Sequence, residues 1–228
     1  MNNQTLTAIF TVVGTRNGYD RVQAEFSPFR DFKVKWSRSY KWIEFEVSDY
    51  LCDAPEDVIE SLAVTIFHRI RDDTHDNLMR YGDAVCEWIT SDDFVRSKQP
   101  VFVRRFRGIS LSTMGNHRDL AESYQRLVDM GLVERDPDIY LGWAAGGSSR
   151  AVGRASILMK VVAMSQLLDC DDVPDEVMDY CLYSQLAHVG MGFNRNGESR
   201  GSQYDALLSR FPDRAEMDSA LRRFNMHI

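Results

Sequence analysis

The stretch 172–194 constrains the fold more than any other part of the chain. It opens with Asp-Val-Pro-Asp-Glu. Proline suits the first turn of a helix, and carboxylates there complement the positive end of the helix dipole. Cys181, Ser184 and His188 then follow at helical spacing. The pattern predicts a helix over 174–191 in which Ser184 and His188 share one face.

The segments around this helix follow a fixed order: Gly153-Arg154, an apolar run over 157–165, Leu168-Asp169, Val173-Pro174 and Tyr183-Ser184-Gln185-Leu186-Ala187-His188. In order and spacing these segments resemble those of the SprT-like and related zinc metallopeptidases, which are zincins. The resemblance covers about residues 120 to 228. It implies an α+β zincin-like domain with a mixed sheet, in which the helix 174–191 is the former active-site helix.

Three of the four functional positions depart from the family pattern. Ser184 and Gln185 stand where a zincin has the first histidine and the glutamate of His-Glu-x-x-His, and Arg200 stands at the third ligand position. His188 alone is retained. Serine is a poor zinc ligand, glutamine cannot act as a base, and a guanidinium offers no lone pair. The resemblance therefore implies a pseudoenzyme, and we expect no catalytic residue, no cofactor and no metal.

Other interpretations of these residues stay open. His188 on an apolar stripe is typical of a hydrogen-bonded core histidine, and Ser184 beside it is a candidate nucleophile that lacks a visible orienting acid and oxyanion pocket. We expect Arg200 to fill the former metal space and to pair with Asp205 or Glu198. A zinc site with atypical ligands is an alternative, although the remaining histidines and cysteines show no close metal-binding spacing.

Composition narrows the class of protein. Of the 228 residues 44% are apolar and 27% are charged, as in ordinary globular proteins, and the net charge is −7. An acidic chain is a poor match for nucleic-acid phosphates. No apolar run reaches the roughly 18 residues of a membrane span, and we see no secretory signal. Four scattered cysteines favour a reducing compartment. We expect a cytoplasmic protein.

Two basic segments are candidate binding sites. Arg104, Arg105 and Arg107 lie among aromatic residues in a run that can stack bases and pair phosphates, although the run equally suits a strand with solvated arginines. Arg150 ends the loop 144–150, which could cradle an anion but lacks the residues and the following helix of a Walker-type loop. For both segments we favour the structural interpretation.

Local patterns predict a mixed order of elements in two regions, 1–115 and 116–228, which we expect to form one compact unit. The first is an α+β region, and the second is the degenerate zincin-like region. The expected strands are 5–13, 33–36, 42–47, 101–111, 139–143 and 156–165, with 19–26 extended or briefly helical. The expected helices are 55–71, 79–89, 118–130, 174–191 and one that starts near 213.

The two regions contain similar units. Residues 42–68 and 157–188 each run from a strand through serine and leucine to an Asp-x-Pro-acidic-acidic helix start. The similarity has two explanations, an internal duplication or the shared use of one helix-start chemistry, and the sequence alone favours the second.

The residues together predict a non-catalytic binding or scaffold module, with a protein or peptide partner held in a retained peptide cleft. The first alternative is an active zinc-dependent peptidase with atypical ligands. The second is a nucleic-acid-associated accessory protein.

Overall fold

The computed structural model describes residues 1–72, 81–145, 150–195 and 197–228. The chain divides into two compact units. Unit 1 is Met1–Phe94 with Arg195–Glu198, and unit 2 is Val95–Asn194 with Ser199–Ile228. The boundary between them lies at Phe94–Val95, whereas the sequence analysis puts it near residue 115. The prediction of a mixed α+β fold is confirmed.

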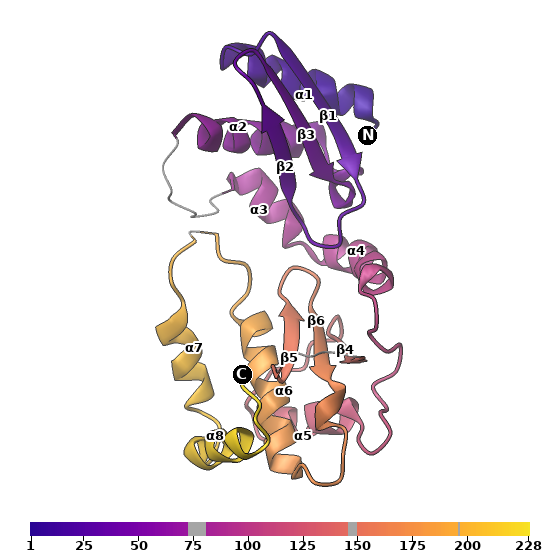
Figure 1. Cartoon of the computed structure of the whole chain (residues 1–228), viewed down its shortest axis with the longest axis vertical. Coiled ribbons are helices and arrows are strands. Elements are labelled where there is room, and N and C mark those ends of the chain that lie inside the picture. The colour runs from indigo at the N-terminus through magenta and orange to yellow at the C-terminus, as the bar shows by residue number, and fades with distance from the viewer. Residues whose placement is uncertain (73–80, 146–149, 196) are drawn as a thin grey trace. The chain divides into compact units, whose positions relative to one another are not determined.

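Unit 1 is a three-stranded mixed sheet with helices on one face (Figure 1). Its strand order is β1-β3-β2, with β1 parallel and β2 antiparallel to β3. Its elements are α1 (Asn3–Arg16), β1 (Arg21–Ser27), β2 (Val34–Arg38), β3 (Trp42–Ser48), the 3-10 helix η1 (Asp49–Leu51), α2 (Glu56–Asp72) and α3 (Asp83–Ile89).

Three phenylalanines from three elements form the centre of unit 1. Phe45 projects from β3, whose alternating side chains are buried and exposed in turn. Its ring lies 4.8 Å from that of Phe10 in α1 and 5.2 Å from that of Phe67 in α2. Tilted and edge-on rings at these distances attract one another in addition to burying apolar surface. The contacts hold α1 and α2 against the same face of the sheet.

Unit 2 repeats the element order and strand pairing of unit 1 (Figure 1). Its sheet order is β4-β6-β5, with β4 parallel and β5 antiparallel to β6. The boundary between the units falls within α4 (Asp92–Arg105), most of which belongs to unit 2. The other elements of unit 2 are α5 (Leu120–Asp129), β4 (Tyr140–Ala144), β5 (Gly153–Ser156), β6 (Val161–Ser165), η2 (Gln166–Leu168), α6 (Asp175–Gly190), α7 (Gly201–Leu208) and α8 (Arg214–Arg223). The similarity between the units is therefore one of whole topology, not of the helix start alone.

Helix α6 is the centre of unit 2. Twelve of its residues are buried, and α5, β5, β6, α7 and α8 all contact it. A helix that is apolar on every side needs neighbours on every side. The stripe that the sequence predicts, with Ser184 and His188 together, is therefore one of several buried faces.

Three predictions of extended structure are wrong. Residues 5–13 lie in α1, because Asn2 caps the helix by accepting from the backbone N–H of Thr5 at 2.9 Å. Residues 101–105 lie in α4, which begins after Ser91 accepts from the Phe94 N–H at 3.2 Å. The run 156–165 is a hairpin and not one strand, because a turn with Lys160 at a positive φ separates β5 from β6.

The other long elements lie where the sequence predicts them. Helices α2, α5, α6 and α8 and strands β1, β2, β3 and β4 agree with their predicted ranges to within a few residues. The predicted helix 79–89 begins at Asp83 in the structure, and its first two residues lie outside the described part of the chain.

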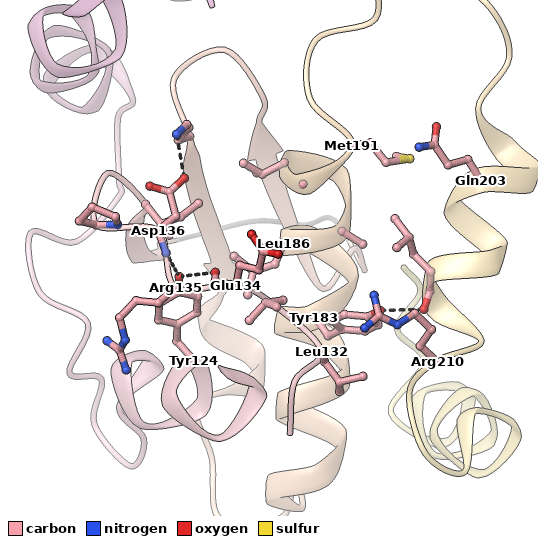
Figure 2. A pocket seen from close by; sticks show the side chains of 18 residues that line it. Tyr124, Leu132, Glu134, Arg135, Asp136, Tyr183, Leu186, Met191, Gln203 and Arg210 are labelled. Carbon is pink, nitrogen blue, oxygen red and sulfur yellow. Dashed lines mark hydrogen bonds and ion pairs between the residues drawn. The ribbon is translucent and has the colours of Figure 1, made fainter. Parts of the chain in front are cut away.

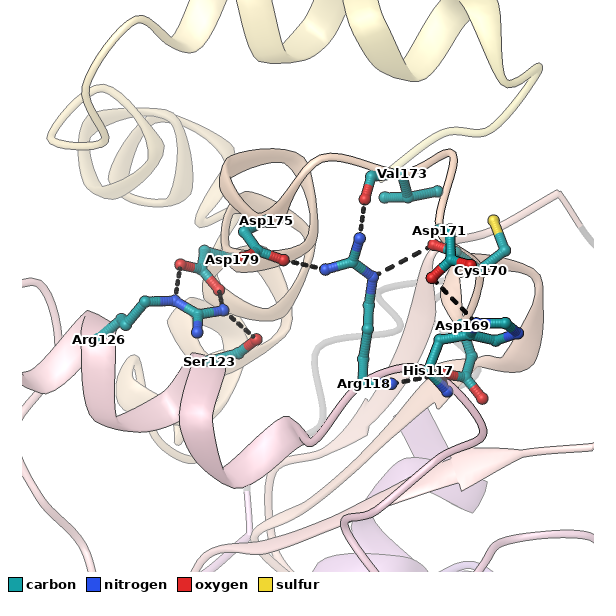
Figure 3. A network of polar contacts seen from close by, with 10 residues as sticks. All are labelled: His117, Arg118, Ser123, Arg126, Asp169, Cys170, Asp171, Val173, Asp175 and Asp179. Carbon is teal, nitrogen blue, oxygen red and sulfur yellow. Dashed lines mark hydrogen bonds and ion pairs between the residues drawn. The ribbon is translucent and has the colours of Figure 1, made fainter.

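A polar network fixes the segment that leads into α6 (Figure 3). The buried Asp169 carboxylate accepts from the backbone N–H groups of Asn116, His117 and Arg118. Arg118 also donates to the Val173 carbonyl and pairs with Asp175 in the first turn of α6. The network holds the loop before α5 against the loop before α6.

A second ion pair joins α5 to α6 directly (Figure 3). Arg126 makes a bidentate contact with Asp179, with both N–O distances at 2.7 Å, and also donates to Ser123. Asp179 is almost fully buried, so its carboxylate needs this partner. Together the two ion-paired arginines set the position of α6.

We expect Asp169→Asn to lower the free energy of unfolding by about 2 kcal/mol, because an amide cannot accept from all three N–H groups. Burial raises the pKa of Asp169, but the three N–H groups outweigh it and lower that pKa below 3.8. The charge on Asp169 therefore stabilises the fold above about pH 4, and this contribution is lost as the pH falls through the lowered pKa. Urea unfolding measures both effects.

The matched control is Asp171→Asn in the same loop. The Asp171 side chain is 87% exposed, and changes at exposed sites usually stay within about 0.5 kcal/mol. Equal losses in the two variants would contradict a special role for Asp169.

Candidate functional site

Ser184 and Gln185 are buried in α6 and contact each other. Ser184 Oγ donates to the Cys181 carbonyl at 2.6 Å and accepts from Gln185 Nε2 at 3.1 Å. Their exposed fractions are 0% and 5%. A nucleophilic serine needs a base that takes its proton and an open path to the substrate. This hydroxyl is instead hydrogen-bonded to the backbone of its own helix.

Gln185 faces strand β5. A methyl group built on Gly153 would lie 3.2 Å from Gln185 Cγ, so the edge strand passes close to the position of the family's glutamate. The close approach leaves little room between β5 and α6 at this level. The space between strand and helix at this level is filled by protein.

His188 is covered by an aromatic ring from α7. Its imidazole stacks on Tyr204 with a centroid distance of 4.1 Å and an interplanar angle of 12°. Tyr204 Oη donates to the Ser184 carbonyl at 3.3 Å. Burial lowers the pKa of His188 and raises that of Tyr204 to about 12. The two rings are therefore neutral near pH 7 and fasten α7 to α6.

Arg200 binds the end of α6. Its guanidinium donates to the carbonyls of Met191, Gly192 and Phe193 at 2.7, 2.9 and 3.3 Å. These carbonyls lie in the turn after Gly190, the last residue of α6, and three hydrogen bonds from one guanidinium hold that turn. The expected pair with Asp205 is not formed, because Asp205 pairs with Arg214 at 3.1 Å.

The residues at the family's positions do not fit zinc. The Ser184 hydroxyl is hydrogen-bonded within its helix, the His188 imidazole lies against Tyr204, and Arg200 is cationic. Burial raises the pKa of the Cys181 thiol, which opposes thiolate formation. Within the described ranges, no group of three or more His, Cys, Asp or Glu side chains is arranged to hold a metal ion.

The arginines of the aromatic run end helix α4. Arg104 and Arg107 are exposed and Arg105 is half-buried. Phe102 is buried and its ring lies 5.9 Å from that of Phe106. A stacking platform for bases needs exposed rings, but Phe102 packs inward. The predicted strand is wrong, because these residues end a helix and enter the turn after it.

Arg150 is exposed and donates to Asn225 Oδ1 at 2.9 Å. The rest of the glycine-serine loop, residues 146–149, lies outside the described residues. The phosphate-cradle hypothesis therefore stays a prediction from sequence.

Sequence reasoning missed a pocket of about 700 Å³ beside α6 (Figure 2). One wall is the segment 132–137 and the opposite wall is α7, with Tyr183 and Leu186 of α6 between them. Gly190 also lines the pocket, and these three residues share a face of α6 next to the Ser184–His188 face. The pocket combines segments that are distant in sequence, so no local pattern indicates it.

The interior of the pocket is apolar and its rim is charged. Tyr183 Oη is satisfied by the Leu207 carbonyl at 2.7 Å. At the rim Lys160 pairs with Asp136 at 2.7 Å, and Arg210 donates to the Gly131 carbonyl at 3.0 Å. An apolar floor with a few polar groups at the edge is typical of ligand and peptide sites.

Comparisons with known proteins give no relative. No family model, no curated protein and no solved structure matches the chain. Within the described residues no helix has the length and apolar character needed to cross a membrane.

We expect His188→Phe to weaken the pH dependence of stability while keeping a ring against Tyr204. Burial lowers the pKa of His188 in the folded chain below the ordinary 6.5. As the pH falls through 6.5, the unfolded chain binds a proton before the folded chain does, so the wild type loses stability. Thermal unfolding at about pH 7.5 and about pH 5.5 measures the change.

The loss of Tm between the two pH values should be larger in the wild type than in His188→Phe. An identical loss in both chains would show that His188 titrates alike in the folded and unfolded states.

Proposed function

We propose that the chain is a non-catalytic binding or scaffold module, a degenerate relative of SprT-like zincins, with a protein or peptide partner. The observation that carries the proposal is that the side chains at the four motif positions make packing and hydrogen-bond contacts within the protein. Ser184, Gln185, His188 and Arg200 all make contacts that hold α6, α7 and the turn between them. None of these contacts leaves a base or a ligand facing a cleft.

The repeated topology supports a structural role for Ser184. When Pro55 of unit 1 is placed on Pro174 of unit 2, Thr65 in α2 falls on Ser184. Thr65 Oγ1 donates to a carbonyl in its own preceding turn at 2.9 Å, as Ser184 Oγ does. Unit 1 has no metallopeptidase motif at this place. A hydroxyl bonded to the helix backbone is therefore common to both units.

The same alignment relates Arg69 to His188. The Arg69 guanidinium lies 4.7 Å from the centre of the Tyr81 ring, and His188 stacks on Tyr204. In each unit a tyrosine from the segment after the helix covers a cationic or imidazole side chain on the helix. Cation–π and stacking contacts of this kind stabilise packing. The equivalence supports packing, and not ligation, as the role of His188.

The pocket beside α6 supports the binding half of the proposal. Its volume of about 700 Å³ is within the range of ligand sites, and its apolar floor suits the apolar side chains of a partner. The four cysteines are free thiols, which supports the proposed cytoplasmic location.

Metal analysis tests the loss of catalysis. We expect zinc far below one ion per purified chain, no chelator-sensitive cleavage of a general protease substrate, and a Tm that chelator leaves unchanged. His188→Ala is the matched variant, since it removes the one ligand-type residue of the motif. Zinc near one per chain that disappears in His188→Ala would establish the alternative of an active peptidase with atypical ligands.

A pull-down from native extract tests the pocket. Val133 lines it, whereas Leu167 is 58% exposed and does not. We expect a partner that the wild type retains to be lost by Val133→Glu, because a charge in the apolar pocket is costly, and to be kept by Leu167→Glu. Equal capture by both variants would remove the pocket from the proposal, and partner release by moderate salt or nuclease would favour the nucleic-acid alternative.

A further inference from the structure

The last residues of the printed sequence form an extra extended segment on the sheet of unit 2. Helix α8 ends at Arg223, and Asn225 turns the chain with a φ of +57°. His227 then pairs in parallel with Ala151, just before the edge strand β5. The segment reaches the sheet next to the strand that faces Gln185 of α6.

Two backbone hydrogen bonds make this pairing. The His227 N–H donates to the Arg150 carbonyl, and the Val152 N–H donates to the His227 carbonyl, both at 3.0 Å. On its other side, the Val152 carbonyl accepts from the Ser165 N–H at the end of β6. Residues 150–152 therefore bridge β6 and the added segment, as an edge strand does when a peptide joins a sheet.

Two side chains set the register of the added segment. Asn225 accepts from the Arg150 guanidinium at 2.9 Å. Met226 is 7% exposed and belongs to the core cluster around α6. His227 and Ile228 are exposed. The segment therefore presents a hydrogen-bond acceptor at Asn225, a buried apolar side chain at Met226 and two exposed residues, His227 and Ile228.

We infer that residues 150–152 and the buried position of Met226 form a docking site for an extended peptide of a partner protein, which Asn225–Ile228 occupies within the same chain. The inference rests on the proposed binding function. A partner with aspartate in place of Asn225 and an apolar residue in place of Met226 fits best, because a carboxylate pairs with Arg150 through charge as well as a hydrogen bond. The occupying segment then acts as an internal competitor.

The contact is small enough to exchange. The segment is held to residues 150–152 by one bridge and by the Arg150–Asn225 hydrogen bond, and to the core by the buried Met226 side chain. The N–H groups of Asn225 and Met226 bond only to the end of the preceding helix, at the Arg222 and Leu221 carbonyls. The segment competes well with a free peptide because it is covalently attached to the chain, which raises its local concentration at the site into the millimolar range. Removal of the tethered segment should therefore open the site to a free peptide.

The test compares the intact chain with a chain that ends at Phe224. The probe is a fluorescein-labelled peptide with the sequence of residues 222–228, and the measurement is anisotropy. We expect saturable binding to the shortened chain and at least about tenfold weaker binding to the intact chain. Peptide Asn225→Asp should bind about threefold more tightly, and peptide Met226→Asp should not bind.

Arg150→Ala in the shortened chain should weaken binding of the probe. The matched control is Arg154→Ala, which changes the exposed arginine of β5 and should leave binding unchanged. A folded shortened chain that does not bind the probe, or an intact chain that binds it equally well, would overturn the inference. Zinc or proteolysis in the intact chain would refute the proposed function without changing probe binding, so the two failures are distinguishable.

Hydrogen exchange of the intact chain decides the matter if the shortened chain does not fold. The amides of Val152 and His227 should then exchange through local opening, well ahead of the Val162 amide in β6. Exchange of all three amides only with global unfolding would show a permanent part of the core and refute a displaceable segment.

Discussion

Helix α6 has neighbours on every side, and this burial limits what its polar side chains can do. A buried hydroxyl, amide or imidazole must find partners within the protein, because water is not there to supply them. Ser184 and Gln185 bond to each other and to the helix, and His188 lies against Tyr204. The burial that stabilises α6 thus also removes these groups from solution chemistry.

Electrostatic contacts hold this apolar helix at both ends. Arg118 and the carboxylates around it fix the segment before the first turn, Arg126 pairs with Asp179 within the helix, and Arg200 donates to the carbonyls of the turn after the helix. An arginine can serve all three purposes because its planar fork donates to several acceptors at once. Arg200 thus serves the turn that follows α6, where it donates to three successive carbonyls.

The sequence predicts elements well where their signals are local. The Pro174 helix start and the Gly131 stop lie close to the ends of α6 and α5. Prediction from the sequence fails where runs of β-branched and aromatic residues suggest the alternating pattern of a strand but form a helix. Residues 5–13 bury Leu6, Phe10 and Val13 at helical spacing, and the cap that decides the matter is Asn2. Tertiary packing overrides the β-propensity of such runs.

In the candidate site, too, the sequence predicts the features that depend on local spacing and misses those that depend on contacts between distant segments. Helical spacing places Ser184 and His188 one turn apart, but it cannot show that Tyr204 covers the imidazole, since the ring comes from another helix. The Arg150–Asn225 contact and the His227 pairing join segments far apart in the chain. Their closeness depends on the sheet order and on the turn at Asn225, neither of which has a local signal. The sequence indicates Arg150 by its charge and its loop. Its hydrogen-bond partner, Asn225, comes from a distant segment that the fold brings beside it.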